Sequence, residues 1–175
     1  DTKQKKIAQQ SIPILGDKAE ILSAYQIRFA QADIDSYLAA RIIDFIRFEF
    51  LRLKISFTFE TVMSHISKVE FLKTAKQQGI KTYRDYVATF NPEINIARVK
   101  YRVSAGGHAV PEQKIRDRYY RSMNLLMQAV ESTDRTFIFD NSSDGERAAF
   151  LAEIEQAEIL KLNPEISKFP LWFID

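Results

Sequence analysis

Basic side chains are concentrated between residues 98 and 121, on both sides of a Gly-Gly pair. Seven cations lie in this stretch: Arg98, Lys100, Arg102, Lys114, Arg116, Arg118 and Arg121. Arginine suits phosphate because its planar guanidinium donates two parallel hydrogen bonds. Gly106 and Gly107 allow backbone angles that a side chain would forbid. The pattern predicts two helices joined by a flexible hinge, with arginines that could close over a polyphosphate.

A second interpretation of the same residues is structural. Pro111 suits the first turn of a helix, and Glu112 follows it near the positive end of the helix dipole. Ile115, Tyr119 and Met123 then recur at helical spacing, with the arginines on another flank. Basic residues beside such an apolar stripe commonly form a solvated face. The cations alone therefore indicate either a phosphate lid or an ordinary helix surface.

A longer match favours the lid. The stretch resembles the zeta-toxin-like, UDP-N-acetylglucosamine kinase family of P-loop proteins, whose bacterial branch has the pattern R-V-x-x-R-V-x-x-G-G-H-x-V-P-x-x-x-I-x-x-R-Y-x-R-S. Here the matching residues are Arg98-Val99, Arg102-Val103, Gly106-Gly107-His108, Val110-Pro111, Ile115, Arg118-Tyr119 and Arg121-Ser122. The resemblance extends from about Ser36 to Ser142 and continues more weakly to the end of the chain.

The substrate side is predicted near Glu60. Residues 54–63 alternate apolar and polar side chains, which predicts a strand. Glu60 and Thr61 would lie at its carboxyl end, where open α/β sheets bind ligands. The alternative is that Glu60 only pairs with a surface cation. The run from Phe57 to Val62 also resembles the family's substrate motif, which implies that Glu60 and Thr61 orient the acceptor. His65 fits a substrate contact and a turn equally well.

The resemblance implies an activity and its participants. The reaction would be ATP-dependent and magnesium-dependent phosphorylation of a hydroxyl on a UDP-amino-sugar, in the cytoplasm, with a neutralising antitoxin as a possible partner. Arg102 and Arg118 would be catalytic, because they clamp the phosphates, and Arg98, Arg116 and Arg121 would support phosphate binding. The family's F-D-N-S is similar to Phe139-Asp140-Asn141-Ser142, although an Asp-Asn pair is more often a simple turn.

One essential motif is missing from the 175 residues. A P-loop kinase needs G-x-x-x-x-G-K-[ST] to cradle phosphate, and none of the five glycines begins or completes it. The expected fold is therefore an α/β, P-loop kinase-like three-layer sandwich with a mostly parallel sheet that is incomplete at the N-terminus. Two interpretations stay open. The chain is part of a kinase, or it is a catalytically inactive fragment or remnant that binds a nucleotide sugar or a protein partner.

Composition sets further bounds. Residues 1–175 are expected to form a single domain, with the lid at about 98–122. A net charge of +2 makes nucleic acid an unlikely partner, and no apolar run is long enough for a membrane span. The absence of cysteine excludes disulfides and thiolate metal sites and fits a reducing cytoplasm. Two histidines are too few for a histidine-based metal site.

Hydrophobic periodicity predicts the elements that must position these residues. Helices are expected over 17–30, 36–53 and 67–78, with another beginning at Asn91-Pro92-Glu93. Strands are expected over 54–63, 81–89 and 137–139, and Arg84-Asp85 marks the second as an edge or irregular strand. Residues 146–162 fit a helix by composition, but the resemblance favours a hairpin of 149–155 with 158–162. Trp172-Phe173 is expected to anchor the tail.

Overall fold

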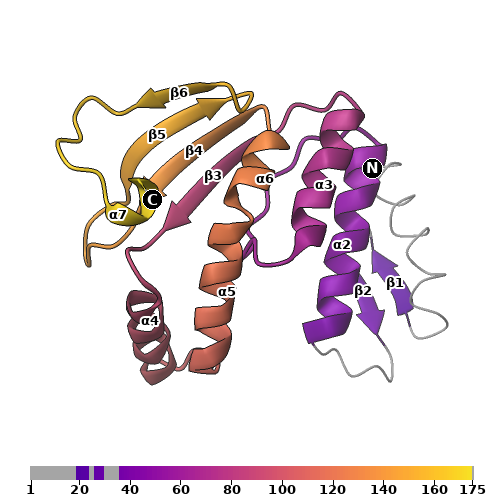
Figure 1. Cartoon of the computed structure of the whole chain (residues 1–175). Coiled ribbons are helices and arrows are strands. Elements are labelled where there is room, and N and C mark those ends of the chain that lie inside the picture. The colour runs from indigo at the N-terminus through magenta and orange to yellow at the C-terminus, as the bar shows by residue number, and fades with distance from the viewer. Residues whose placement is uncertain (1–18, 24–25, 30–35, 175) are drawn as a thin grey trace. The chain divides into compact units, whose positions relative to one another are not determined.

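The structure is a computed structural model that describes residues 19–23, 26–29 and 36–174. The chain forms two compact units, residues 1–59 and residues 60–175. Within the described ranges, the first unit contains a two-stranded hairpin and one long helix. The second contains a four-stranded sheet and the remaining helices (Figure 1).

The hairpin of the first unit replaces a predicted helix. Strand β1 (Ala19–Ser23) pairs antiparallel with β2 (Gln26–Phe29), so the helix expected over 17–30 is wrong. Apolar residues in so short a window fit a helical period and a strand period alike, and here the backbone groups of the two strands pair with each other. Helix α2 (Ser36–Arg52) confirms the helix expected over 36–53.

Residues 54–63 do not form the strand that their alternation predicts. The alternation itself is present from 53 to 58, because Leu53, Ile55 and Phe57 are partly covered while the residues between them are exposed. Phe57 is covered by aromatic contacts, with its ring 5.2 Å from that of Phe50 and 5.9 Å from that of Phe59. A strand also needs a backbone partner, and this segment pairs with no strand in the described part of the chain.

The sheet of the second unit is mixed. Its strand order is β3 (Tyr83–Ala88), β4 (Arg135–Asp140), β5 (Ala149–Glu155) and β6 (Ile159–Leu162). β3 and β4 are parallel, whereas β4–β5 and β5–β6 are antiparallel. The α/β class is therefore confirmed, but this sheet is mixed rather than mostly parallel. β3 lies at one edge, as Arg84-Asp85 predicted.

The β5–β6 hairpin confirms the interpretation taken from the resemblance. Its strands pair from Ala152–Leu162 to Glu155–Ile159, and the helix that composition allowed over 146–162 does not form. The tail also docks as expected. Trp172 and Phe173, in the short helix α7 (Leu171–Ile174), pack against the buried cluster of Tyr86, Ile138 and Leu151.

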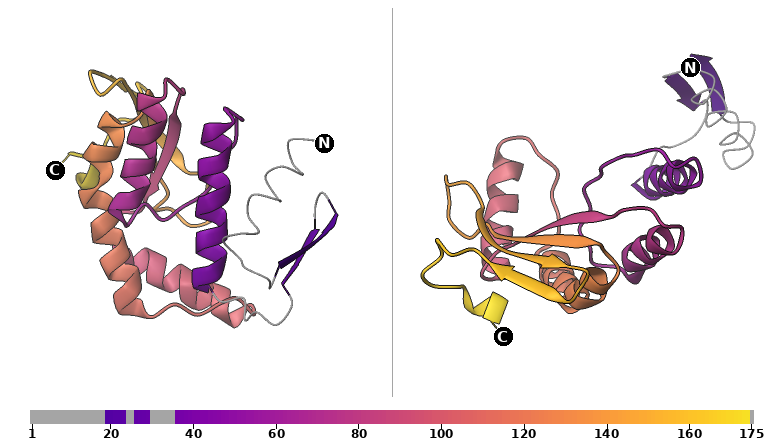
Figure 2. Two further views of the ribbon diagram at one scale, coloured as in Figure 1. Left: turned by 90° about the vertical axis from the view of Figure 1, so that its right-hand side faces the viewer. Right: turned by 90° about the horizontal axis from the view of Figure 1, so that it is seen from above.

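Four helices accompany this sheet: α3 (Ile66–Gln77), α4 (Pro92–Ser104), α5 (Glu112–Asn124) and α6 (Leu126–Glu131). Met123 and Leu126 pack on the sheet face that carries Tyr86 and Ala88. α3 packs on α6 through a second buried cluster that includes Val69 and Ala129. α6 continues along the direction of α5 (Figure 1), whereas α4 lies crosswise to α5 (Figure 2).

Candidate functional site

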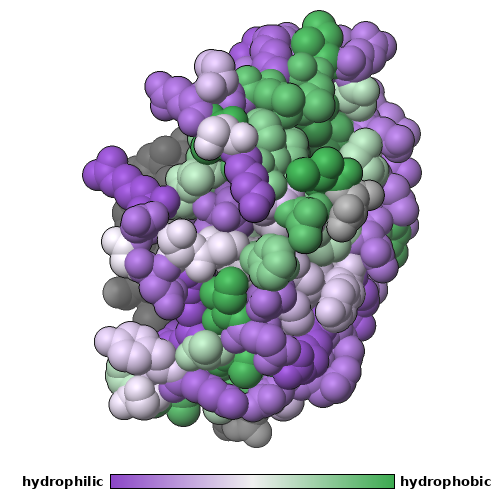
Figure 3. Space-filling model, turned by 60° about the vertical axis from the view of Figure 1, so that its left-hand side comes forward, coloured by the Kyte–Doolittle hydropathy of each residue, from purple (hydrophilic) through white to green (hydrophobic). Residues whose placement is uncertain are grey.

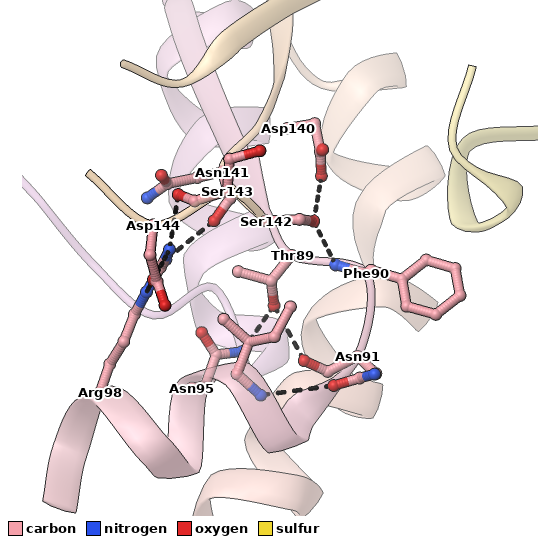
Figure 4. Close-up of polar contacts among 11 residues, drawn as sticks. Thr89, Phe90, Asn91, Asn95, Arg98, Asp140, Asn141, Ser142, Ser143 and Asp144 are labelled. Carbon is pink, nitrogen blue, oxygen red and sulfur yellow. Dashed lines mark hydrogen bonds and ion pairs between the residues drawn. The ribbon is translucent and has the colours of Figure 1, made fainter. Parts of the chain in front are cut away.

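The carboxyl ends of the two parallel strands lie side by side and carry a cluster of polar residues (Figure 4). β3 ends at Ala88 and β4 at Asp140, and these two residues are register partners. Thr89, Phe90 and Asn91 follow the first strand, and Asn141 to Asp144 follow the second. The carboxyl edge of parallel strands is where open α/β sheets bind ligands, so this cluster is the candidate functional site.

Hydrogen bonds through Ser142 connect the two strand ends. Its hydroxyl donates to Asp140 Oδ1 at 2.6 Å and accepts from the Phe90 N–H at 2.7 Å. The indole N–H of Trp172 donates to the same Asp140 oxygen at 3.1 Å. One carboxylate oxygen therefore receives two donors, one of them from the C-terminal helix. The indole contact could not be read from sequence, because Trp172 and Asp140 are 32 residues apart.

Arg98 is bound to the loop that follows β4. Its guanidinium donates to the carbonyl oxygens of Asn141 at 2.8 Å and Ser143 at 3.1 Å, and it forms an ion pair with Asp144 at 3.0 Å. Arg98 was expected to support phosphate binding. In this structure its donors are directed to protein oxygens, so it holds the 141–144 loop against α4.

Helix α4 begins with a well-formed cap. The Asn91 side chain accepts hydrogen bonds from the N–H groups of Glu93 and Ile94, at 3.0 and 3.3 Å. This confirms the start predicted at Asn91-Pro92-Glu93, since an Asn at that position satisfies backbone donors that the helix leaves unpaired. Beside the cap, Asn95 donates to the Thr89 hydroxyl at 2.9 Å. The first turn of α4 is thus fixed to the end of β3.

Two charge pairs and a tyrosine hydroxyl connect α4 and its preceding loop to α5. Arg116 pairs with Glu93 through both carboxylate oxygens, and Lys100 pairs with Glu112 at 2.7 Å. The Tyr119 hydroxyl donates to the carbonyl oxygen of Thr89 at 2.9 Å. Arg116 was expected to support phosphate binding, but here it bridges the two helices. The two helices of the predicted lid are therefore joined to each other by ion pairs.

The tyrosine contact also has an electrostatic consequence. Burial raises the pKa of Tyr119, and the neighbouring Tyr86, Tyr120 and Asp140 raise it further. Tyr119 therefore remains protonated at neutral pH and remains a hydrogen-bond donor to the loop after β3. Burial likewise raises the pKa of Tyr86, whose hydroxyl lies 2.9 Å from the sulfur of Met123.

The Gly-Gly pair has the properties that a helix junction requires. Gly106 has φ +88°, a backbone conformation that side chains disfavour. Gly107 approaches Arg102 so closely that an added Cβ would lie 2.6 Å from Arg102 Cγ and 2.8 Å from its carbonyl oxygen. The side chain of Arg102 donates to the His108 carbonyl at 3.1 Å. Both glycines are therefore needed where α4 ends.

Arg118 and Arg121 are the arginines of this set left without a partner. Arg118 is half-buried on α5 and Arg121 is exposed. Within the described ranges, no hydrogen bond or ion pair involves either guanidinium. Their donors are therefore available to a ligand, whereas those of Arg98 and Arg116 are committed to protein oxygens.

The predicted acceptor residues lie elsewhere. Glu60 and Thr61 are exposed in an irregular segment, so they do not stand at the end of a strand as expected. Among the described contacts, none joins either residue to the five arginines. His65 caps α3 by accepting from the Ser67 N–H at 3.2 Å, which supports its turn role.

The residues present fit ATP and magnesium only in part. Magnesium in kinases needs one or two carboxylates beside the phosphates, and Asp140 at a strand end would supply one. In the part of the chain that the structure describes, no group of three or more histidine, aspartate or glutamate residues could hold a metal ion. The phosphate cradle is not supplied by any motif of the sequence.

Comparison with known proteins gives one partial relative and no family. No family model matches the chain, and no solved structure matches it significantly. An uncharacterized protein of Haemophilus influenzae is 36% identical over 69 residues, which are 39% of this chain and 49% of the relative. The chain thus spans about half the length of this curated relative. No helix in the described part of the chain combines the length and the apolarity of a membrane span.

Proposed function

We propose that this chain carries the lid and acceptor regions of a zeta-toxin-like phosphotransferase with a P-loop kinase fold. The expected reaction transfers phosphate from ATP to a hydroxyl of a UDP-amino-sugar. The observation that supports the proposal best is the juxtaposition in Figure 4, where α4, which carries Arg98, follows the carboxyl end of β3 beside Asp140 at the end of β4. That edge is where such a fold would receive phosphate.

In this proposal the arginines have two different tasks. Arg118 and Arg121, which have no partner among the described residues, would bind the transferred phosphate, and Arg102 would join them by leaving the His108 carbonyl. Arg98 and Arg116 would position the helix pair instead, through the 141–144 loop and Glu93. Neutralising charge on the phosphoryl group is the main catalytic contribution in such enzymes. The acceptor role of Glu60 and Thr61 rests on the resemblance alone, because neither residue lies at the end of a strand.

ATP, magnesium, an antitoxin partner and a cytoplasmic location belong to the same proposal. All four are implied by the resemblance. Of the residues that the structure describes, only Asp140 could contribute to magnesium binding and only the arginines to phosphate binding. The 175 residues contain no motif that would cradle the phosphates of ATP.

The second candidate function is a catalytically inactive fragment or remnant that binds a nucleotide sugar or a protein partner. Two observations favour it. The phosphate-cradling motif is missing from the sequence, and three of the five lid arginines already donate to protein oxygens. A binding protein could keep these structural contacts after phosphotransfer was lost.

Substitution of single arginines tests the catalytic assignment. We expect Arg118→Ala and Arg102→Ala each to lower phosphate transfer to UDP-N-acetylglucosamine by the full-length protein at least tenfold, an effect of about 1.4 kcal/mol. Lys114→Ala is the matched control, because Lys114 is an exposed cation of the same helix. It should retain activity within about twofold. Wild-type turnover in both arginine variants would remove the lid assignment.

Calorimetry separates the two candidate functions. The 175-residue chain would be titrated with UDP-N-acetylglucosamine and, separately, with ATP and magnesium. Binding of the sugar nucleotide without ATP supports the inactive alternative, whereas tight ATP binding contradicts it. Binding of neither ligand, with a folded circular dichroism spectrum, would contradict the phosphotransferase and the sugar-binding remnant and leave only a remnant that binds a protein partner.

A further inference from the structure

The outermost strand β6 exposes a backbone edge and apolar side chains together. Three of its four residues are apolar and about half exposed: Ile159 at 51%, Leu160 at 54% and Leu162 at 49%. Figure 3 shows hydrophobic side chains gathered on the side of the molecule that comes forward from the left of Figure 1, where β6 and α7 lie. Exposed apolar edges of this kind commonly pair with another strand.

The pairing with β5 determines which N–H and C=O groups of β6 are directed to the open edge. The N–H of Asn163 donates to the Leu151 carbonyl at 2.8 Å, so residue 163 is directed toward β5. Backbone groups alternate along an antiparallel strand. Residues 161 and 159 are therefore also directed toward β5, and Leu160 and Leu162 present their N–H and C=O groups to the open edge. In the described part of the second unit, no backbone hydrogen bond uses these groups.

The usual protection of an edge strand is weakened here. A lysine on an edge strand discourages pairing because its charge would meet the incoming strand. Lys161 is the basic residue of β6, and its ammonium group forms an ion pair with Glu155 of β5 at 2.9 Å. The ammonium group of Lys161 therefore lies toward β5 rather than toward the open edge, and the Glu155 carboxylate neutralises its charge. The side chains of Leu160 and Leu162 share the face of Ile154 and Ala152, their register partners.

We propose that β6 pairs antiparallel with β6 of a second copy of this chain, and joins two four-stranded sheets across a two-fold axis at Lys161. In this register Leu160 of each copy faces Leu162 of the other copy, so the two-fold axis generates two equivalent leucine pairs. Both are the residues whose backbone groups are directed outward, so the hydrogen bonds and the leucine contacts use the same pairs. A self-complementary strand satisfies the symmetry of an isologous dimer. This interface does not rest on the proposed phosphotransfer.

A single introduced cysteine tests the register, because the chain has no cysteine of its own. The two copies of residue 161 would form a non-hydrogen-bonded pair with Cα atoms about 4.5 Å apart, within the range that a disulfide spans. Lys161→Cys should therefore give a covalent dimer under mild oxidation with glutathione. The control is Val87→Cys, an exposed position on the opposite edge strand β3. Equal cross-linking at both positions would overturn the proposal.

Sedimentation of the uncrosslinked chain gives an independent measurement. The wild-type chain should show a concentration-dependent mass that approaches twice that of the monomer. Leu160→Lys places an unpaired charge on the edge and should give a monomer, whereas Val87→Lys should still dimerise. Leu160→Pro should also give a monomer, since it removes an outward N–H group that β5 does not use. A wild-type monomer at all concentrations, or a dimer that only Val87→Lys disrupts, would contradict the proposal.

Discussion

Arg84 is a charged side chain on the covered face of β3. It is 8% exposed, and among the residues that the structure describes its Nη2 atom has no hydrogen-bond partner. The guanidinium lies 4.8 Å from the centre of the Tyr86 ring and 3.5 Å from the Leu126 carbonyl. Burial lowers the pKa of Arg84 to about 10, so the group is still charged at neutral pH. A buried charge without a carboxylate partner is expected to cost stability.

Replacement by an apolar residue of similar length should therefore help folding. We expect Arg84→Met to raise the free energy of unfolding by about 1 kcal/mol, measured by urea denaturation at pH 7. Arg147→Met, at an exposed position, is the control and should change stability by less than about 0.5 kcal/mol. A clear loss of stability in Arg84→Met would mean that the contact with Tyr86 outweighs the cost of desolvation.

At the scale of elements, Asp134 fastens the beginning of β4 to the residues before β3. Its Oδ2 accepts from the Thr82 N–H at 2.8 Å and from the Thr82 hydroxyl at 3.2 Å, and its Oδ1 pairs with Lys81 at 3.0 Å. Burial alone would raise the pKa of Asp134, but these hydrogen bonds outweigh it and lower the pKa below the ordinary 3.8. The ionised carboxylate is therefore stabilised in the folded state.

This lowered pKa predicts a pH-dependent contribution to stability. Because the unfolded state binds the proton more readily, the contribution is present above pH of about 4 and is lost as the pH falls through the folded-state pKa. Asp134→Asn should lower the free energy of unfolding by about 1–2 kcal/mol at pH 7 and by much less at pH 2. Asp85→Asn, at an exposed position of β3, should have no such effect. A loss that is independent of pH would argue against the ionised form.

The helix pair α4–α5 shows why an element can be predicted while its contacts cannot. Asn91, the Gly-Gly junction and Pro111 set the helix ends through local backbone chemistry. The partners of Arg98 and Arg116 depend instead on which loop and helix the fold brings beside them. The sequence therefore predicted the helices and the Gly-Gly junction, but it assigned to phosphate three arginines, Arg98, Arg102 and Arg116, that the structure pairs with protein groups.

At the scale of the whole molecule, the two compact units have consequences for folding. Both buried clusters of the second unit consist of residues after Glu60. Trp172, the only tryptophan of the chain, packs against one of them, with its ring 6.5 Å from that of Tyr86. Its fluorescence should therefore report the unfolding of the second unit.

A fragment of residues 60–175 tests this division. We expect this fragment to fold alone. Its tryptophan fluorescence transition should lie within about 4 °C of that of the full chain, because removal of the first unit should lower the free energy of unfolding of the second by less than about 1 kcal/mol. The measurement is a thermal melt of both proteins at the same concentration. An unfolded fragment, or a much lower midpoint, would show that the first unit contributes to the core of the second.

Several elements were determined by sequence alone because their causes are local. Helix α4 starts at its Asn91 cap and ends two residues before Gly106, which has a positive φ, and helix α5 starts directly after Pro111. Backbone conformation at such points is fixed by the few residues around them. Periodicity failed over 17–30. In 54–63 the alternation that it predicted is present only as far as residue 58 and gives no strand, since a strand exists only where another backbone pairs with it.

Tertiary structure alone decided which distant groups meet. The adjacency of β3 and β4 brings Asp140, Ser142 and Phe90 together across 50 residues of sequence, and it leaves Glu60 outside that cluster. The open edge of β6 is also a property of strand order, which is set by chain connectivity and packing. The residue types of the chain determined what chemistry was available, and the sheet determined which of those residues share a site.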